Sequence, residues 1–382
     1  MDTASLSSEA DRAAATGDLQ RAIALLKQAA EQGPDDPALW LKMAAMQRMS
    51  GNPRAALEAV HRALALAPLD FTALLMRASL LQRLGDAGAG EAWGHALAQK
   101  PVGDLPPQLA AVLAEAEQHH ARWLAEREAR MAAAMRKAES QASEEERRRI
   151  ARFRSNALRR TRVYHSEPTH SHFPELRERE FHPRSAFPWF ETLEAATDAI
   201  GQELDAVMAA ERTELVPYIQ YEAHQPLQQW RELNRNADWT AIHLIRNGET
   251  VEANARHCPR TLEVLAQLPQ PVIRGSGPNA MFSLLAPHTH IPAHVGVSNA
   301  RLVCHLPLII PEACWFRVGA QTRTWKRGEA LVFDDTIEHE AMNDSDALRV
   351  VLIFDVWHPD LGAAEREAVA ALIGSEGGAA GL

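Results

Sequence analysis

Two histidines and one arginine in the last quarter of the chain carry the strongest chemical signal. His294 lies in the segment PAHVG, His339 follows 45 residues later in FDDTIEHEA, and Arg349 comes ten residues after that. Imidazole nitrogens are suitable ligands for Fe(II) and other divalent transition metals. Arg349 lies in the run LRVVLIFDV, which is otherwise nearly all apolar, and a charge buried there is costly unless it is paired. The spacing therefore indicates a two-histidine metal site beside an arginine that binds a carboxylate.

This order of residues is typical of non-haem iron oxygenases that use 2-oxoglutarate as a cosubstrate. The arginine would anchor the distal carboxylate, while open positions on Fe(II) would receive the keto-acid end and O₂. One position departs from the common arrangement, because Gly296 replaces the carboxylate that usually stands two residues after the first histidine. Either a water fills the third position on the metal or another residue supplies the ligand. Asp334 and Asp335 are the acids nearest His339 in sequence.

Short runs of β-forming residues surround these side chains. Residues 191–213 have the spacing of an amphipathic helix, and later runs are broken by Pro and Gly. Strands joined at hairpin lengths favour a sandwich or jelly roll over alternating βαβ units. These runs place His294 in a loop before the second expected strand and His339 directly after the fourth. The expected strands are residues 280–285, 301–310, 314–318, 330–333 and 348–356.

The N-terminal part of the chain repeats with a period of 34 residues. A Gly-Asp or Gly-Asn pair recurs at residues 17, 51 and 85, and 34 residues is the period of the tetratricopeptide repeat. In such a repeat, small residues let two helices approach, glycine forms the turn between them and proline ends the second helix. The third unit departs, because Gly90 and Gly94 stand in its second helix. A simple bundle of helical hairpins is the alternative.

A long charged helix is expected after the repeats, from about residue 105 to 162. This segment is rich in Ala, Glu and Arg, which favour helix formation. Eight arginines lie between residues 147 and 162 with no acid among them, and three glutamates precede them. Such a run could bind phosphate or an acidic partner. We favour the simpler interpretation, a solvated helix and hinge.

Composition bounds the function further. Of 382 residues, 46% are hydrophobic and 24% are charged, with a formal net charge of −10, so the chain is neither disordered nor collagen-like and has no general attraction to nucleic acid. Three cysteines without a CxxC pair argue against a disulfide framework or a cysteine zinc site. The acidic N-terminal segment predicts no signal peptide, and no apolar run predicts a membrane span. We expect a cytoplasmic protein.

The C-terminal motifs resemble those of the aspartyl/asparaginyl β-hydroxylase family. The resemblance rests on PHTHIPAHVGVSNARLVCHLPLIIP, CWFRVG and TWKRGEALVFDDTIEHEAMNDSDALRVVLIFDVWHP, and upstream on segments such as FPELREREFHPRSAFPWFETLEAAT and DWTAIHLIRNG. It covers about residues 165–365. Members of the family lack the third carboxylate ligand, so Gly296 fits the resemblance. Some members also carry tetratricopeptide-like helices before the catalytic domain.

The resemblance implies a set of site residues and cofactors. His294 and His339 would bind Fe(II), and O₂ and 2-oxoglutarate would be cosubstrates. Arg301 would lie near the substrate. Two substitutions set this chain apart from the animal enzyme, because Val303 replaces an arginine and Met281 replaces a lysine. The cosubstrate would be held by Arg349, Ser283, His305 and Trp239.

The predicted function is hydroxylation of a C–H bond, with the β-carbon of Asp or Asn residues in a peptide or protein as the leading substrate. A lipid acyl chain or a small metabolite is the alternative substrate, and a non-catalytic tetratricopeptide scaffold with a ligand-binding jelly roll is the alternative function. The repeats would bind a protein partner. The expected parts are a helical repeat region at 1–104, a charged helical linker at 105–164, a jelly-roll oxygenase domain (a double-stranded β-helix) with flanking helices at 165–365, and a flexible tail at 366–382.

Overall fold

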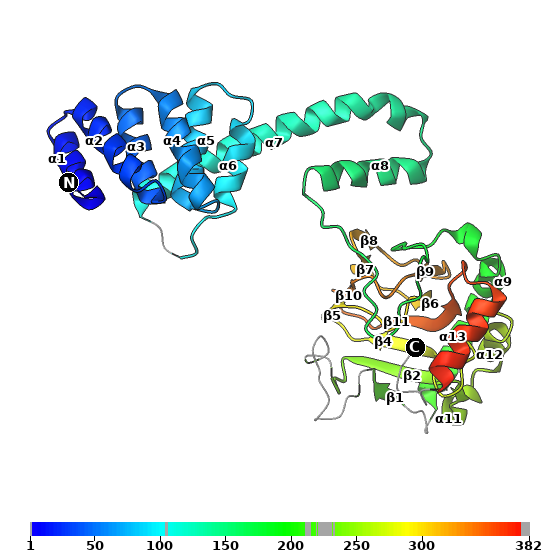
Figure 1. The fold of residues 1–382 in the computed structure, drawn as a ribbon. Helices are drawn as coiled ribbons and strands as arrows, with labels where there is room; N and C mark the ends of the chain where they lie inside the picture. The colour runs from blue at the N-terminus through cyan, green and yellow to red at the C-terminus, as the bar shows by residue number, and fades with distance from the viewer. Residues whose placement is uncertain are drawn as a thin grey trace. The chain divides into compact units, whose positions relative to one another are not determined.

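A computed structural model describes residues 2–103, 106–210, 215–218, 220, 231 and 234–375. The chain divides into two compact units, Met1–Arg160 and Thr161–Leu382. The first unit is helical, and the second contains two antiparallel β-sheets with flanking helices (Figure 1). None of the helices in this described part combines the length and apolar character that a bilayer crossing requires.

Three helical hairpins open the first unit, as the repeat predicts. Gly17, Gly51 and Gly85 have φ angles of 84°, 78° and 68°, a left-handed conformation that glycine adopts without strain. Alanines at the interhelical contacts, such as Ala22 and Ala56, are fully buried, so the helices pack closely. The expected helical-repeat architecture is confirmed. The helices are α1 (Thr3–Ala15), α2 (Leu19–Gln32), α3 (Pro37–Met49), α4 (Pro53–Leu66), α5 (Phe71–Arg83) and α6 (Ala89–Leu97).

The two unusual glycines of the third hairpin have a packing role. A Cβ at Gly90 would lie 2.0 Å from the side chain of Trp123, and one at Gly94 would lie 2.5 Å from His120. Both partners belong to α7 (Pro107–Gln141). The missing side chains therefore let the long helix α7 lie directly against α6, where His120 also bonds to the carbonyl of Gly90 at 2.8 Å.

This close approach predicts the effect of a small substitution. Gly90→Val should lower the free energy of unfolding of the first unit by about 1–3 kcal/mol, because overpacking forces α7 away from α6. Thermal unfolding of the full chain followed by circular dichroism would measure the loss of helix. Glu91→Ala, one residue along the same helix and exposed, is the matched control and should change little. An unchanged unfolding temperature for Gly90→Val would contradict this packing.

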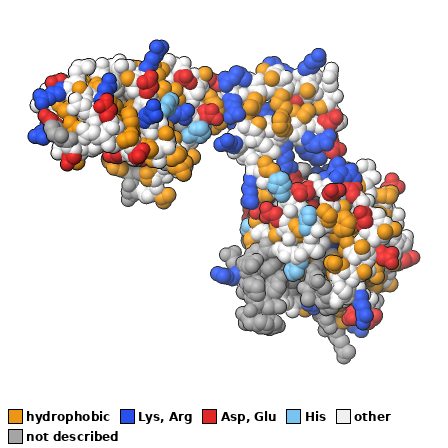
Figure 2. All heavy atoms as spheres, in the orientation of Figure 1, with side chains coloured by type: hydrophobic (Ala, Val, Ile, Leu, Met, Phe, Trp, Pro, Cys, Tyr) orange, Lys and Arg blue, Asp and Glu red, His pale blue; other side chains and the backbone are white. Residues whose placement is uncertain are grey.

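The charged segment forms a helical hairpin. Helix α8 (Glu144–Ala157) begins with a capping box between Ser143 and Glu146 and has no buried residue. Arg154 of α8 pairs with Glu139 of α7 at 2.8 Å, and Arg160, which follows α8, pairs with Glu128 of α7 at 2.7 Å. On the face shown in Figure 2, basic and hydrophobic side chains are interspersed on this hairpin. These features agree with a solvated helix.

The second unit is built on two antiparallel sheets. The larger sheet has the strand order β1-β2-β4-β11-β6-β9, with β3 also paired to β2, and the smaller has the order β5-β10-β7-β8. This arrangement confirms the expected antiparallel, jelly-roll-like domain. The strands are β1 (Leu215–Pro217), β2 (Trp239–Arg246), β3 (Glu249–Thr250), β4 (Ala280–Leu285), β5 (Thr289–His294), β6 (Arg301–Ile309), β7 (Cys314–Val318), β8 (Gln321–Arg323), β9 (Leu331–Phe333), β10 (His339–Asn343) and β11 (Arg349–Trp357).

Helices flank this pair of sheets. One buried cluster joins apolar side chains of α9, α10 and α12 to the larger sheet, and a second joins the two sheets. The helix expected over 191–213 is interrupted near Ala196, so it forms α9 and α10, and its last three residues lie outside the described part of the chain. Residues from 366, expected in a flexible tail, are helical as far as Ser375, because Ile373 is buried beside Ile273 and Trp357. The helices are η1 (Arg184–Ala186), α9 (Phe190–Ala195), α10 (Thr197–Ala209), α11 (Glu252–Ala255), α12 (Pro259–Leu265) and α13 (Ala363–Ser375).

Candidate functional site

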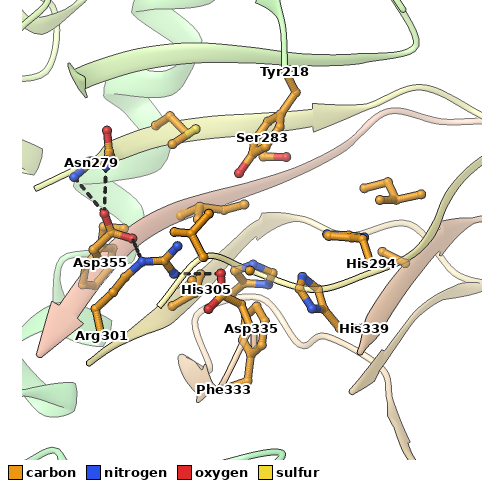
Figure 3. A pocket seen from close by; sticks show the side chains of 18 of the residues that line it. Tyr218, Asn279, Ser283, His294, Arg301, His305, Phe333, Asp335, His339 and Asp355 are labelled. Atoms are coloured by element: carbon orange, nitrogen blue, oxygen red, sulfur yellow. Dashed lines mark hydrogen bonds and ion pairs between the residues drawn. The ribbon is translucent and has the colours of Figure 1, made fainter. Parts of the chain in front are cut away.

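The two expected metal ligands lie opposite each other on neighbouring strands of the smaller sheet. His294 is the last residue of β5 and His339 is the first residue of β10, and the register pairs them directly. Their ring centroids are 4.0 Å apart. His294 was expected in a loop, but it ends a strand that the sequence analysis did not find. Both residues line a cavity of about 820 Å³ between the sheets, and Figure 3 shows their rings side by side.

Hydrogen bonds fix which nitrogen of each ring faces the cavity. Nδ1 of His294 lies 2.7 Å from the carbonyl of Pro292, and Nδ1 of His339 lies 3.1 Å from that of Ile337. Each neutral ring therefore donates its Nδ1–H to the backbone, so Nε2 is its unprotonated nitrogen, a pattern common to metal-binding histidines. Burial lowers the pKa of His339 to about 4 and that of His294 well below its usual value. Both rings are neutral at physiological pH, as metal binding requires.

Arg349 is a buried cation that lines the same cavity. It is 2% exposed, and burial lowers its pKa to about 10. Its guanidinium lies 5.1 Å from the ring centre of Trp325, Nη1 reaches the carbonyl and hydroxyl oxygens of Ser283 at 3.4 Å each, and Nε has no hydrogen-bond partner among the described residues. An unpartnered buried donor on a cation fits a carboxylate ligand.

The expected cosubstrate residues surround this arginine. Trp239 donates from Nε1 to the hydroxyl oxygen of Ser283 at 3.1 Å, which leaves the hydroxyl proton available for a ligand. Tyr218 stacks on Trp239 with ring centroids 4.0 Å apart, and its burial raises its pKa to about 12. His305 accepts from Nε1 of Trp325 at 3.3 Å through Nδ1, so its own proton lies on Nε2.

Arg301, the expected substrate residue, lines the cavity but is already paired. Its Nη1 lies 2.8 Å from Asp335 Oδ2 and its Nε lies 3.6 Å from Asp355 Oδ1. Burial alone would lower the pKa of Arg301, but the two carboxylates raise it above its usual value. Asp355 also accepts from the backbone and side-chain nitrogens of Asn279 at 3.0 and 3.1 Å. Figure 3 shows the guanidinium between the two acids.

The space beside Gly296 is filled by one of these acids. A Cβ at position 296 would lie 2.1 Å from Asp335 Oδ2, and the other oxygen of Asp335 has no hydrogen-bond partner among the described residues. Asp335 therefore occupies the region into which a carboxylate at position 296 would project. No group of three or more His, Cys, Asp or Glu side chains is arranged to hold a metal ion in the part of the chain that the structure describes. The fit to a metal rests on the two imidazoles.

Sequence reasoning missed several cavity residues. Asp355 had a usable signal, since it is a second charge in the apolar strand that contains Arg349. His243 lies in β2 opposite Met281, and its Nδ1 has no partner among the residues that the structure describes. Tyr218 had no signal in the sequence. Its place in the site depends on the pairing of β1 with β2.

Buried neutral histidines predict a loss of stability in acid. Burial lowers the pKa of His182 to about 3, that of His243 to about 4 and that of His358 below its usual value. Burial also lowers the pKa values of three cavity histidines, His294, His305 and His339. Between pH 6.5 and 4 the unfolded chain binds protons that the folded chain does not, so stability falls as the pH falls, by up to about 1.4 kcal/mol per pH unit for each histidine. Burial raises the pKa values of Asp334 and Asp355, so these two carboxyl groups stabilise the folded state as the pH falls. They oppose the effect of the histidines but are fewer than the six histidines.

Thermal unfolding of the metal-free protein at pH 7.5 and 5.5 would measure this effect. We expect a lower unfolding temperature for the second unit at pH 5.5. His182→Leu should reduce the difference, because it removes one of two buried imidazoles that pack edge to face with ring centroids 5.1 Å apart. The Nε2 atoms of both rings have no partner among the described residues. Equal unfolding temperatures at the two pH values would contradict the prediction.

Comparisons with known proteins agree with this site. The family described as "Aspartyl/Asparaginyl beta-hydroxylase" matches residues 194–359, and "Tetratricopeptide repeat" matches residues 13–80. The first match includes both candidate metal ligands and Arg349.

Three relatives are similar to part of this chain. Human "Aspartate beta-hydroxylase domain-containing protein 2" is 38% identical over 35% of this chain and 37% of its own length. Human "Aspartyl/asparaginyl beta-hydroxylase" is 36% identical over 37% of this chain and 18% of its own. "Ornithine lipid ester-linked acyl 2-hydroxylase" of Rhizobium tropici is 34% identical over 46% of this chain and 59% of its own. The alignments thus span less than two thirds of each relative.

Proposed function

Because the second unit carries a domain of the aspartyl/asparaginyl β-hydroxylase family, we propose that this protein is an Fe(II)- and 2-oxoglutarate-dependent dioxygenase that hydroxylates a C–H bond. One observation carries the proposal. A pair of neutral imidazoles and a buried arginine whose Nε has no partner among the described residues line the same cavity. Such a pair of sites can bind the two ends of a keto-dicarboxylic acid at once.

The residues present fit this metal and cosubstrate. His294 and His339 would hold Fe(II) through Nε2, since their Nδ1 protons are committed to backbone carbonyls. When bound, Fe(II) supplies the redox chemistry that activates O₂, while 2-oxoglutarate is oxidised to succinate and CO₂. Held by two histidines, the metal would have positions open for the keto-acid and O₂.

The chain's own contribution is orientation. Arg349 would bind the distal carboxylate, and the Ser283 hydroxyl, which already accepts from Trp239, would donate to the same group. His305 would donate from Nε2, because Trp325 occupies its Nδ1. These fixed donors hold one geometry of the cosubstrate relative to the histidine pair, and such positioning can account for a large part of a rate enhancement.

Two kinds of substrate are candidates. The family and the human relatives suggest the β-carbon of an Asp or Asn residue in a peptide or protein. The Rhizobium relative suggests a lipid acyl chain, with the same chemistry at a different carbon. The repeat region would recruit a protein partner or substrate segment, and we propose that the enzyme works in the cytoplasm.

Formation of succinate tests the proposal. Protein loaded with Fe(II) should convert 2-oxoglutarate to succinate in the presence of O₂, and a gain of one oxygen atom in the mass of a peptide or lipid would identify the substrate class. The double variant His294→Ala/His339→Ala is the control. Equal turnover by this variant and the wild type would contradict an enzymatic role. Under anaerobic conditions, absence of 2-oxoglutarate binding by the iron-loaded wild type would also contradict a ligand-binding scaffold.

A further inference from the structure

Among the described residues, Arg301 is the buried cation of the candidate substrate region, and it already lies between two carboxylates, although its Nε makes no hydrogen bond. Arg301 and Asp355 are each 5% exposed, and Asp335 is 7% exposed. The two carboxylates flank a single guanidinium, so this cluster carries more acid than base. One oxygen of Asp335 has no partner among the described residues. A further carboxylate placed here would be desolvated next to like charge.

Apolar side chains cover the cavity wall between this cluster and the cosubstrate residues. Met281 of β4 lies opposite Ile353 of β11, and Val303 of β6 lies opposite Asp355. All three apolar side chains are 8% exposed and line the cavity. They also belong to the buried cluster that joins the two sheets. A ligand that passes this wall contacts methyl, methylene and thioether groups.

The remaining charged cavity residues do not change this balance. Arg349 is reserved for the cosubstrate in the proposed function. Glu340 is bonded to Arg317 and His290. Arg246 is exposed at the cavity edge, and His243 is neutral because burial lowers its pKa to about 4. Within the described residues, the interior of the substrate region is therefore apolar and acidic.

We propose that this wall is a subsite for an uncharged acyl chain, with Met281, Val303 and Ile353 as the residues that contact it, and that Asp335 and Asp355 exclude carboxylate groups. The inference rests on the proposed function and narrows its substrate class. An acyl chain needs no hydrogen-bond partner. A peptide segment would bring backbone N–H and C=O groups against side chains that offer them none.

A matched pair of ligands tests the subsite. Monomethyl decanedioate carries one neutral end and one carboxylate, whereas decanedioate has the same chain with a carboxylate at both ends. Binding to the full-length protein, loaded with Fe(II) and saturating 2-oxoglutarate without O₂, can be followed by thermal shift. We expect the monoester to bind at least 10-fold more tightly at pH 7.5. Equal or tighter binding of the diacid, or no binding of the monoester up to its solubility limit, would overturn the proposal.

Variants of the wall and of the acidic cluster test which residues cause the preference for the monoester. Met281→Lys adds a cation to the wall and should reduce the preference for the monoester to 3-fold or less, while Met281→Leu should keep it. Asp355→Asn removes one negative charge with little change of shape and should also reduce the preference, so a failure of Met281→Lys to fold leaves a second test. An unchanged preference in a folded Met281→Lys or Asp355→Asn variant would contradict the proposed role of these charges.

An assay with a peptide substrate distinguishes a failure of this inference from a failure of the proposed function. If an Asp- or Asn-containing peptide stimulates succinate formation and the monoester does not bind, the acyl subsite is wrong and the hydroxylase proposal stands. If the iron-loaded protein neither binds 2-oxoglutarate nor forms succinate, the hydroxylase proposal fails by itself. Binding of the monoester is measured without turnover and does not depend on that result.

Discussion

Replacement of Arg349 by methionine is expected to reduce the affinity for 2-oxoglutarate by about 30- to 4000-fold, which corresponds to about 2–5 kcal/mol for the loss of a buried charge pair. In the cosubstrate-free protein, the same change should leave the free energy of unfolding unchanged or raise it by about 1–4 kcal/mol, as when buried charges are replaced by packed apolar groups. The substitution should therefore weaken cosubstrate binding without destabilising the cosubstrate-free fold.

The reason for this difference between binding and folding lies in the surroundings of the arginine. The guanidinium is desolvated, and its hydrogen bonds to Ser283 are long, at 3.4 Å. Burial is also what lowers the pKa of Arg349 to about 10. The protein without cosubstrate therefore carries an unfavourable buried charge. A bound carboxylate would compensate this charge, and methionine would remove it.

Isothermal titration with 2-oxoglutarate under anaerobic conditions and urea unfolding of the cosubstrate-free protein would measure the two effects. Arg349→Lys is the matched control, because it keeps a cation and loses the planar fork. We expect Arg349→Lys to bind 2-oxoglutarate more tightly than Arg349→Met but less tightly than the wild type. Marked destabilisation of the cosubstrate-free Arg349→Met protein would show that the arginine stabilises the fold.

Two of the expected strands have side chains that are buried on both faces. All six residues of β4 and all nine of β11 are buried, so these strands appear in the sequence as continuous apolar runs that hydrophobicity identifies. The expected strands at 301–310, 314–318 and 330–333 correspond to β6, β7 and β9, whose ends differ from the expected bounds by at most one residue.

Two of the missed strands carry the candidate metal ligands. β5, with the sequence THIPAH, and β10, with the sequence HEAMN, are short, and each carries one candidate metal ligand at its end. Polar side chains that point into a cavity interrupt the apolar pattern of a strand, so sequence reasoning is weakest where function requires such residues. The histidines were therefore found by their chemistry and spacing, whereas the strands that hold them were not.

Charges within apolar runs were informative, but their partners were not predictable. Arg349 was found because a lone cation in an apolar strand needs a ligand. The pairing of Arg301 with Asp335 joins residues 34 positions apart, and it depends on how β6 packs near the turn before β10. The sequence showed the arginine without showing that its charge is already compensated. Because Arg301 already lies between Asp335 and Asp355, we do not expect it to bind a carboxylate of the substrate.

Substitution of Gly296 by aspartate is expected to lower the free energy of unfolding by about 3–5 kcal/mol, because it disrupts a buried ion pair. The new Cβ would lie 2.1 Å from Asp335 Oδ2, so Asp335 must move, and its bond to Arg301 at 2.8 Å is lost. For a unit of this size the unfolding temperature should fall by about 6–20 °C. The introduced carboxylate can approach the metal position only by displacing Asp335.

A double-variant cycle tests this coupling. Asp335→Ala alone should destabilise the protein because it leaves Arg301 with one carboxylate, and adding Gly296→Asp to Asp335→Ala should cost far less than adding it to the wild type. Gly201→Ala is the matched control, since a Cβ there meets the guanidinium of Arg327 at an ordinary 3.5 Å. Thermal unfolding with and without Fe(II) would measure the four proteins of the cycle and the control. Additive losses in the cycle would show that Asp335 does not occupy the space beside Gly296, and a third carboxylate ligand at position 296 would then be compatible with the folded site.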